Sequence, residues 1–336
     1  VSENQGKPMK NLPDFELLKI SQMGGQPTRR TFDALDHVLI ILPNNPPDAL
    51  FRRVPQGAQL KRLLRRARAT DLDSASTRLN NAKATGITVA KFDERSAFAQ
   101  LTWARKLIAQ CSREKPSSLG MLILGLNEQQ RTSAVEALVA AAEAAAFELP
   151  SFKSEQKPGS RLKRIRILAS KPRVNLDTVR AQALGNNIAR WFTALPPNEL
   201  DAKNYRRFIK ALTARHGIRM TMLGESKLAE LGANAFLAVS QGNAKRDAGI
   251  IQLRYRPPGI NDADLVLVGK GILFDTGGNN LKPFKSMLDM HMDMEGSAVA
   301  LGTLIALATL EVPYGVDAWL PITENRLSAT AYKSQD

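Results

Sequence analysis

The sequence predicts an α/β protein of two domains, each built as a sheet packed against helices. The chain has 336 residues, of which 43% are apolar, so it can bury two cores of the usual domain size of about 100 to 200 residues. Short apolar runs typical of buried strands, such as residues 36–42 and 119–126, precede stretches of helix-forming composition, such as residues 129–146. This alternation favours a parallel sheet covered by helices.

The first domain is expected over residues 11–165. The two apolar runs and the Ala-rich helix belong to it, and they predict an α/β layer fold. Residues 164–169 (RIRILA) alternate polar and apolar side chains, as a strand does when one of its faces is solvated. The Pro-, Gly- and Lys-rich residues 154–161 lie near the domain boundary, and we expect them to be exposed.

The second domain is expected over residues 172–336. Helices are predicted from Leu176 to Leu195 and over residues 295–310, where small side chains share a face. Strands are predicted at residues 217–223, 250–255, 264–269 and 316–322. This order of elements favours a mostly parallel central sheet with helices on its faces.

The segment Val268–Gly296 (VGKGILFDTGGNNLKPFKSMLDMHMDMEG) carries the candidate chemistry of the second domain. Its strand ends at a glycine, and polar residues that follow a buried strand lie at the rim of the sheet, where ligands collect. Two lysines and two aspartates stand there in a fixed register, with the later three at 5, 12 and 23 residues after the first: Lys270, Asp275, Lys282 and Asp293.

Carboxylates and a lysine that converge at such a rim can hold divalent ions. The pair Gly277-Gly278 allows positive φ, so the chain can double back over whatever Asp275 binds. Hard divalent ions prefer oxygen ligands, and a lysine beside two cations can lose its proton and become a nitrogen ligand. A site of carboxylates and amines suits Mn, Mg or Zn rather than a structural zinc finger.

Other interpretations of this segment are weaker. Any one of the four charged residues, taken alone, would be a solvated side chain or half of an ordinary ion pair, because charged residues are mostly exposed. A Walker A phosphate loop is excluded by Asp264 and Gly271, and Phe274 breaks a GxGxxG pattern. The combined register within FDTGG and LKP therefore favours a metal site.

The segment resembles the metal-binding segment of the leucyl aminopeptidase family, also called cytosol aminopeptidases. That family has GKG, FDSGG, LKP and DMxG elements in this order, and the likeness extends over about residues 176–336, with a PPNE turn at 196–199 and ENRLS at 324–328. The resemblance implies a macro-like α/β fold for the first domain and a catalytic metallopeptidase fold for the second. It also implies homo-hexamers.

The resemblance assigns a role to each residue of the motif. Lys270, Asp275 and Asp293 would bind two divalent ions, Mn, Zn or Mg, that hold a bridging water. That water would attack the peptide bond after the N-terminal residue of a peptide substrate. Lys282 would hydrogen-bond the scissile carbonyl and the oxyanion that forms. Met290 would line the pocket for the first side chain, or else pack in the core as a gap filler.

Several positions depart from the family pattern. Thr276 replaces a serine, Glu295 stands where a small residue is usual, Ser297 replaces an alanine, and Arg326 replaces a methionine. The extra carboxylate of Glu295 could alter the second metal position. These changes are compatible with altered specificity or with an enzyme that has lost its activity. They do not change the spacing of the four charged residues of the motif.

The resemblance also implies that the chain is truncated at its C-terminus. Family members continue past the ENxxS segment to a further Asp, Glu and Arg, whereas this sequence starts at Val1 and ends at Asp336. We therefore expect the catalytic domain to be partial, with about half of the metal ligands. The polypeptide of residues 1–336 is itself expected to be inactive as a peptidase.

The chain is strongly basic, with 47 Lys and Arg against 32 Asp and Glu and a formal net charge of +15. A dense part is KRLLRRAR, where Lys61, Arg62, Arg65 and Arg66 would lie on the solvated face of an amphipathic helix. Such a face can also contact the phosphates of nucleic acid. The alternative function is therefore a catalytically impaired family member that acts as a DNA-binding regulator.

The remaining composition indicates a cytoplasmic protein. The single cysteine, Cys111, excludes a disulfide within the chain and fits a reducing compartment, and its surroundings suggest a small buried side chain. There is no apolar run of about 18 residues, so we expect no membrane span. His291 lies near the motif, but the family does not use histidine ligands, and it is expected beside the site or at the surface.

Overall fold

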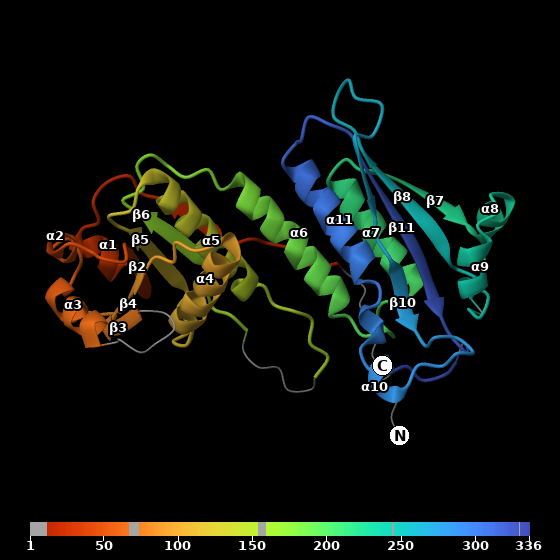
Figure 1. Cartoon of the computed structure of the whole chain (residues 1–336), viewed down its shortest axis with the longest axis horizontal. Coiled ribbons are helices and arrows are strands. Elements are labelled where there is room, and N and C mark those ends of the chain that lie inside the picture. Colours follow the sequence, from red (N-terminus) through yellow and green to blue (C-terminus); the bar gives the residue numbers. More distant parts are fainter. Residues whose placement is uncertain (1–11, 67–73, 154–158, 244, 329) are drawn as a thin grey trace. The chain divides into compact units, whose positions relative to one another are not determined.

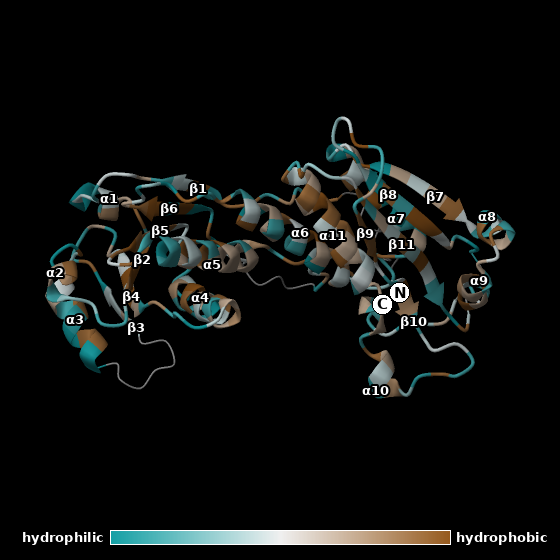
Figure 2. Cartoon of the chain, turned by 45° about the horizontal axis from the view of Figure 1, so that its top comes forward, coloured by the Kyte–Doolittle hydropathy of each residue, from teal (hydrophilic) through white to brown (hydrophobic). Residues whose placement is uncertain are grey.

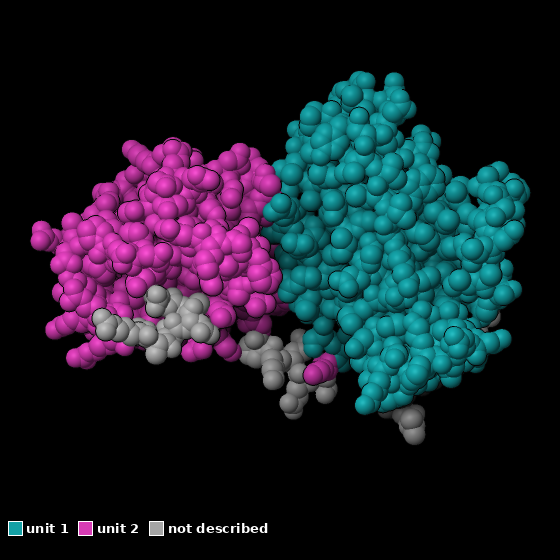
Figure 3. All heavy atoms as spheres, in the orientation of Figure 1, with its two compact units in different colours: residues 1–15, 149–152, 181–336 teal, residues 16–148, 153–180 magenta. Residues whose placement is uncertain are grey.

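The computed structural model describes residues 12–66, 74–153, 159–243, 245–328 and 330–336. The chain divides into two compact units (Figure 3). Unit 2 comprises residues 16–148 and 153–180, and unit 1 comprises residues 1–15, 149–152 and 181–336. Each unit has its own sheet and helices (Figure 1).

Unit 2 is built on a six-stranded sheet with the order β1-β6-β5-β2-β4-β3. All of its pairings are parallel except that between β3 and β4, so the sheet is mostly parallel. The strands are β1 Lys19–Gln22, β2 His37–Leu42, β3 Ser74–Arg78, β4 Gly86–Lys91, β5 Ser118–Ile123 and β6 Arg164–Leu168. The strands predicted from the three apolar patterns of this unit are confirmed as β2, β5 and β6.

Helices cover both faces of this sheet because its central strands are apolar on both sides. In β2, Leu39 and Ile41 contact one core, and Val38 and Ile40 contact the other. Helices α4 Ala97–Ser112 and α5 Glu128–Ala146 contribute to the first core, which includes Cys111, buried at 1% exposure. The short helices α1 Arg29–Asp33, α2 Asp48–Phe51 and α3 Gly57–Arg66 contribute to the second.

Unit 1 has a five-stranded sheet in which β10, β11, β8 and β7 lie in that order and β9 also pairs with β11. The strands are β7 Arg219–Gly224, β8 Gly249–Tyr255, β9 Leu265–Val268, β10 Gly271–Asp275 and β11 Val316–Asn325. β9 and β10 run parallel to β11, whereas β8 is antiparallel to both β11 and β7. This sheet is therefore mixed, and the expectation of a mostly parallel sheet is wrong here, although the α/β class is confirmed.

The long strand β11 explains the mixed sheet. β8 pairs with β11 from Val316 to Ile322 and occupies one of its edges. β9 pairs with residues 316–319 and β10 with residues from Ile322 onward, so both must lie on the opposite edge. β9 and β10 thus form an interrupted line along β11, and Gly269-Lys270 lies at the interruption. The periodic apolar pattern of the sequence does not reveal that β8 runs antiparallel to β11, or that β9 and β10 are interrupted at Gly269-Lys270.

Helices α6 Asp177–Thr193, α7 Ala202–Arg215 and α11 Glu295–Thr309 lie on one side of this sheet (Figure 1). Gly185 of α6 and Gly302 of α11 permit close contact, since a Cβ on Gly302 would lie 2.4 Å from the Gly185 carbonyl oxygen. The shorter helices are α8 Glu225–Glu230, α9 Asn234–Ser240, α10 Phe284–Met287 and the 3-10 turn η1 Met290–Met292. Figure 2 shows hydrophobic residues along the strands of both units. Across the described ranges, every helix is too short or too polar to cross a membrane.

Candidate metal centre

The predicted turn after β10 brings Lys282 back to the end of the strand. Gly277 and Gly278 have φ of +88° and +67°, a region that glycine adopts without strain. The backbone N–H of Lys282 donates to the Thr276 carbonyl at 2.9 Å, and the Thr276 N–H donates to the Asn325 carbonyl at 3.0 Å. The glycine pair therefore closes a turn that is fixed to β11.

Asp275 accepts hydrogen bonds through both of its carboxylate oxygens. Its Oδ2 accepts a hydrogen bond from Lys282 Nζ at 2.6 Å, and its Oδ1 accepts from the Gly277 N–H at 3.0 Å and from Asn325 Nδ2 at 2.8 Å. Burial, the largest single influence, would raise the pKa of Asp275, but these donors together lower it below the ordinary value. Asp275 is thus held as an oriented carboxylate.

Met290 lies beside this ion pair. Its Sδ is 3.1 Å from Lys282 Nζ, and it begins the turn η1. The predicted neighbours Lys282, Asp275 and Met290 therefore come together. Asn325, which also bonds Asp275, is not among the predicted site residues, although it stands in the ENxxS pattern of this region.

Lys270 and Asp293 form the second acid–lysine pair of the motif. Lys270 Nζ lies 2.8 Å from Asp293 Oδ2, and the two side chains are 59% and 19% exposed. This contact lacks hydrogen-bond geometry, and Asp293 Oδ2 is a buried oxygen without a hydrogen-bond partner among the residues the structure describes. The Lys270 ammonium thus lies beside this oxygen, where a bound metal ion would replace it.

The glycines around Lys270 allow helix α11 to approach the interrupted strand. A Cβ on Gly269 would lie 2.4 Å from the Gly296 carbonyl oxygen, and the Ser297 N–H donates to the Lys270 carbonyl at 2.7 Å. The hydroxyl of Ser297, which replaces the alanine usual in the resembled pattern, lies 2.9 Å from the buried hydroxyl of Tyr205. Lys270 is therefore fixed through its backbone while its side chain remains free to reach Asp293.

The two pairs form separate contact sets. No hydrogen bond or ion pair links Lys282 and Asp275 to Lys270 and Asp293 within the described ranges. The same ranges contain no cluster of three or more His, Cys, Asp or Glu side chains suited to a metal. Glu295 is exposed. The donor set here is thus two carboxylates and lysine amines, which fits a hard divalent ion and not a thiolate or imidazole site.

His291 lies in η1, two residues before Asp293. Its Nδ1 is buried and has no hydrogen-bond partner in the described part of the chain, and burial lowers its pKa from the ordinary value. This placement agrees with its expected position beside the site.

The basic residues of α3 adopt the amphipathic arrangement that the sequence predicts. Leu60 is fully buried, and Arg62, Arg65 and Arg66 are exposed. Lys61 forms an ion pair with Asp48, so it is not a free cation. This helix therefore packs one face on the core and turns the other to solvent.

Comparison with known proteins identifies the family of the chain. Residues 187–336 match the family described as "Cytosol aminopeptidase family, catalytic domain". The chain is 36% identical over 210 residues to a probable cytosol aminopeptidase of Synechococcus sp. (strain WH7803), covering 60% of this chain and 42% of the relative. It is 32% identical over 245 residues to one of Rhodococcus opacus (strain B4), covering 69% and 48%. The chain thus spans about half the length of these curated relatives.

Solved structures of leucyl aminopeptidases share the fold. One, from Leishmania major in complex with actinonin, has a TM-score of 0.71 at 18% identity over 95% of this chain and 64% of that one. A mutant of tomato leucine aminopeptidase has a TM-score of 0.75 at 19% identity, covering 98% and 66%. The comparisons give no support to the DNA-binding alternative. Residues 187–336 therefore belong to the cytosol aminopeptidase family, also known as the leucyl aminopeptidase family.

Proposed function

We propose that unit 1 carries part of the active site of a two-metal aminopeptidase, which hydrolyses the N-terminal residue from peptides. The family membership of residues 187–336 supports this activity. The observation that carries the proposal is the buried Oδ2 of Asp293, which lies 2.8 Å from Lys270 Nζ and has no hydrogen-bond partner in the described part of the chain. Such an atom is a natural donor to a cation.

Lys270, Asp275 and Asp293 would hold the divalent ions. Bound ions of this kind polarise a carbonyl and lower the pKa of a bound water, which supplies the nucleophile. The oxygen-rich donor set suits Mn, Zn or Mg, and the bottromycin maturation enzyme BotP, whose structure was determined in complex with Mn, shares the fold at a TM-score of 0.67 and 22% identity. Lys270 would bind an ion through its amine nitrogen, so its present ion pair with Asp293 would be exchanged for the ion.

Lys282 would act on the substrate rather than on the metal. Its Nζ is a cation held by Asp275 at 2.6 Å, and a fixed cation beside the scissile carbonyl stabilises the oxyanion that develops there. Asn325 and the Gly277 N–H hold Asp275 from the opposite oxygen, so the carboxylate stays oriented while Lys282 moves to the substrate. Met290, in contact with Lys282 Nζ, would line the pocket for the first side chain.

The substrate class, the location and the assembly of the protein are proposed from its family. Peptides with a free N-terminus are the proposed substrates, and the names of the relatives as cytosol aminopeptidases support a cytosolic location. Assembly into homo-hexamers is proposed from the resemblance of the motif.

The test uses the chain extended by the remaining part of a curated relative's catalytic domain, because the chain spans only about half of such relatives. This extended chain should bind two divalent ions per subunit and should release the N-terminal residue from a free dipeptide but not from its N-acetylated form. The 336-residue chain, with three of the proposed metal donors, should not hydrolyse either peptide. An extended chain that binds metal and cleaves neither peptide would contradict the proposal.

A further inference from the structure

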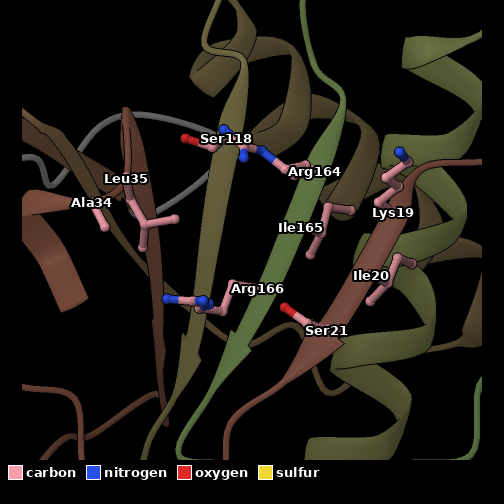
Figure 4. A pocket seen from close by; sticks show the side chains of 9 residues that line it. All are labelled: Lys19, Ile20, Ser21, Ala34, Leu35, Ser118, Arg164, Ile165 and Arg166. Atoms are coloured by element: carbon pink, nitrogen blue, oxygen red, sulfur yellow. The ribbon is translucent and has the colours of Figure 1, made fainter.

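Unit 2 contains a cavity of about 340 Å³ that the proposed peptidase reaction does not use. It lies on the sheet face formed by β1, β6 and β5, and its cationic side chains are Lys19 of β1 and Arg164 and Arg166 of β6 (Figure 4). The side chains of Arg164 and Arg166 both extend from β6 across β5 (Figure 4). Leu35 and Ala34 contribute an apolar part of the lining.

The sheet register places the residues that carry these charges at neighbouring positions. Lys19 lies directly opposite Arg164 in the parallel pairing of β1 and β6, and Ser21 lies opposite Arg166. Residues two apart on a strand point to the same face, so the two arginines share the face that Lys19 also occupies. Like charges directly opposite each other destabilise a sheet. The three exposed charges on this face repel one another, and an anion bound among them would relieve that repulsion.

The described part of the chain supplies no such anion. In the part of the chain that the structure describes, Lys19, Arg164 and Arg166 have no ion pair and no side-chain hydrogen bond. The nearby Asp36 is already bound: its Oδ2 accepts from the Ser118 hydroxyl at 3.0 Å, and its Oδ1 is 3.2 Å from Lys83 Nζ. The carboxylate of Asp36 is therefore already neutralised by Lys83 and hydrogen-bonded by Ser118.

We propose that this cavity binds a small molecule that carries a diphosphate group. Guanidinium groups match phosphate oxygens in bidentate geometry, and three cations exceed what one phosphate neutralises. Ser21 adds a hydroxyl donor to the lining. The apolar side chain of Leu35 can contact the organic part of the ligand. A concave site of this volume suits a small ligand, and its lining has no aromatic side chain on which the bases of single-stranded nucleic acid would stack.

Calorimetric titration of the whole chain with inorganic pyrophosphate, ADP and inorganic phosphate tests the proposal. Pyrophosphate and ADP should bind saturably and more tightly than phosphate, with affinity that falls as salt is added. Arg164→Gln and Arg166→Gln should each weaken pyrophosphate binding by about 10- to 100-fold, because each removes charge-assisted hydrogen bonds. Lys163→Gln, at an exposed residue outside the lining, is the matched control and should bind like the parent.

Thermal unfolding, with and without pyrophosphate, provides a second measurement. Without ligand, the Tm of Arg164→Gln should equal or exceed that of the parent, since the change removes one of the like charges on this sheet face. Pyrophosphate should raise the Tm of the parent and of Lys163→Gln, but not of Arg164→Gln. Absence of saturable pyrophosphate binding, or equal loss in the Lys163 variant, would overturn the proposal. So would retention on duplex DNA that the arginine variants lose while pyrophosphate binds to none of the proteins.

Discussion

Lys282 Nζ donates to Asp275 Oδ2 at 2.6 Å, and seven residues of chain separate the two. The contact exists because Gly277 and Gly278 turn the backbone at positive φ and return Lys282 to the end of β10. It gives the proposed substrate-binding cation and a proposed metal ligand a shared hydrogen bond. A metal ion at Asp275 and the Lys282 ammonium would therefore compete for the same oxygen, Asp275 Oδ2. Removing Lys282 should leave the metal bound, so a substitution can separate the role of the lysine from that of the metal ligand.

Replacement of Lys282 tests its role toward the substrate. In the extended chain, Lys282→Ala should lower kcat for an aminoacyl anilide by about 10²- to 10³-fold, the usual effect of losing one oxyanion donor. Metal content should not fall, because the change removes a competitor of the ion at Asp275. Lys285→Ala, an exposed lysine of α10, is the control. Near-parental turnover, or loss of metal, would refute this role.

Substitution of Gly269 tests how the interrupted strand is held. A Cβ at this position would lie 2.4 Å from the Gly296 carbonyl oxygen and 2.6 Å from the Ser297 Cα. Since both neighbours are backbone atoms of the start of α11, Gly269→Ala should lower the free energy of unfolding by roughly 1 to 3 kcal/mol, as overpacking usually does. Urea unfolding measures this change.

Gly224→Ala is the matched control for that experiment. Gly224 has a negative φ of −76°, and a Cβ added there meets nothing within 4 Å. The control should unfold within about 0.5 kcal/mol of the parent, as surface substitutions usually do. Equal effects of the two substitutions would show that close packing at Gly269 is unimportant.

His37 should make unit 2 sensitive to acid. The ring is 4% exposed, its Nε2 bonds the Thr88 hydroxyl at 2.9 Å, and burial lowers its pKa from 6.5 to about 4, with Glu114 opposing and Arg78 adding to the shift. In the unfolded chain, His37 therefore binds a proton near pH 6.5, whereas in the folded chain it does so only near pH 4. Stability from this group is full above about pH 6.5 and falls by roughly 3 kcal/mol as the pH drops to about 4.

The measurement is urea unfolding of the parent and of His37→Gln at pH 7 and pH 4.5. The parent should lose more unfolding free energy than the variant over this interval, because glutamine does not titrate. Parallel losses in the two proteins would exclude His37 as the source of the acid sensitivity.

Much of this structure could be predicted because local patterns determine it. The alternating burial of β6 follows directly from RIRIL, and the apolar run before Gly269 is the strand β9. The expectation that this strand is buried is wrong, since Val266 and Val268 are exposed. The positive φ of Gly277 and Gly278 was expected from the residue type alone. The motif also brought Lys282, Asp275 and Met290 together as expected, since all three lie within one short segment.

Partners distant in sequence could not be predicted in this way. Asn325 reaches Asp275 across 50 residues, and Tyr205 reaches Ser297 across 92. The antiparallel direction of β8 and the shared edge of β9 and β10 depend on how β11 pairs over its length. Periodicity reports which face of an element is buried, but it does not report which element covers that face.

Binding of a divalent ion by Asp275 and Asp293 tests the central claim most directly. After removal of metal by chelation and dialysis, the 336-residue chain should bind Mn²⁺ saturably in a calorimetric titration. Asp275→Asn and Asp293→Asn, which keep the side-chain shape and remove the charge, should each lose this binding. Asp289→Asn, at an exposed aspartate between them, should bind like the parent. Mn²⁺ binding that is unchanged in both site variants would contradict the assignment of Asp275 and Asp293 as metal ligands.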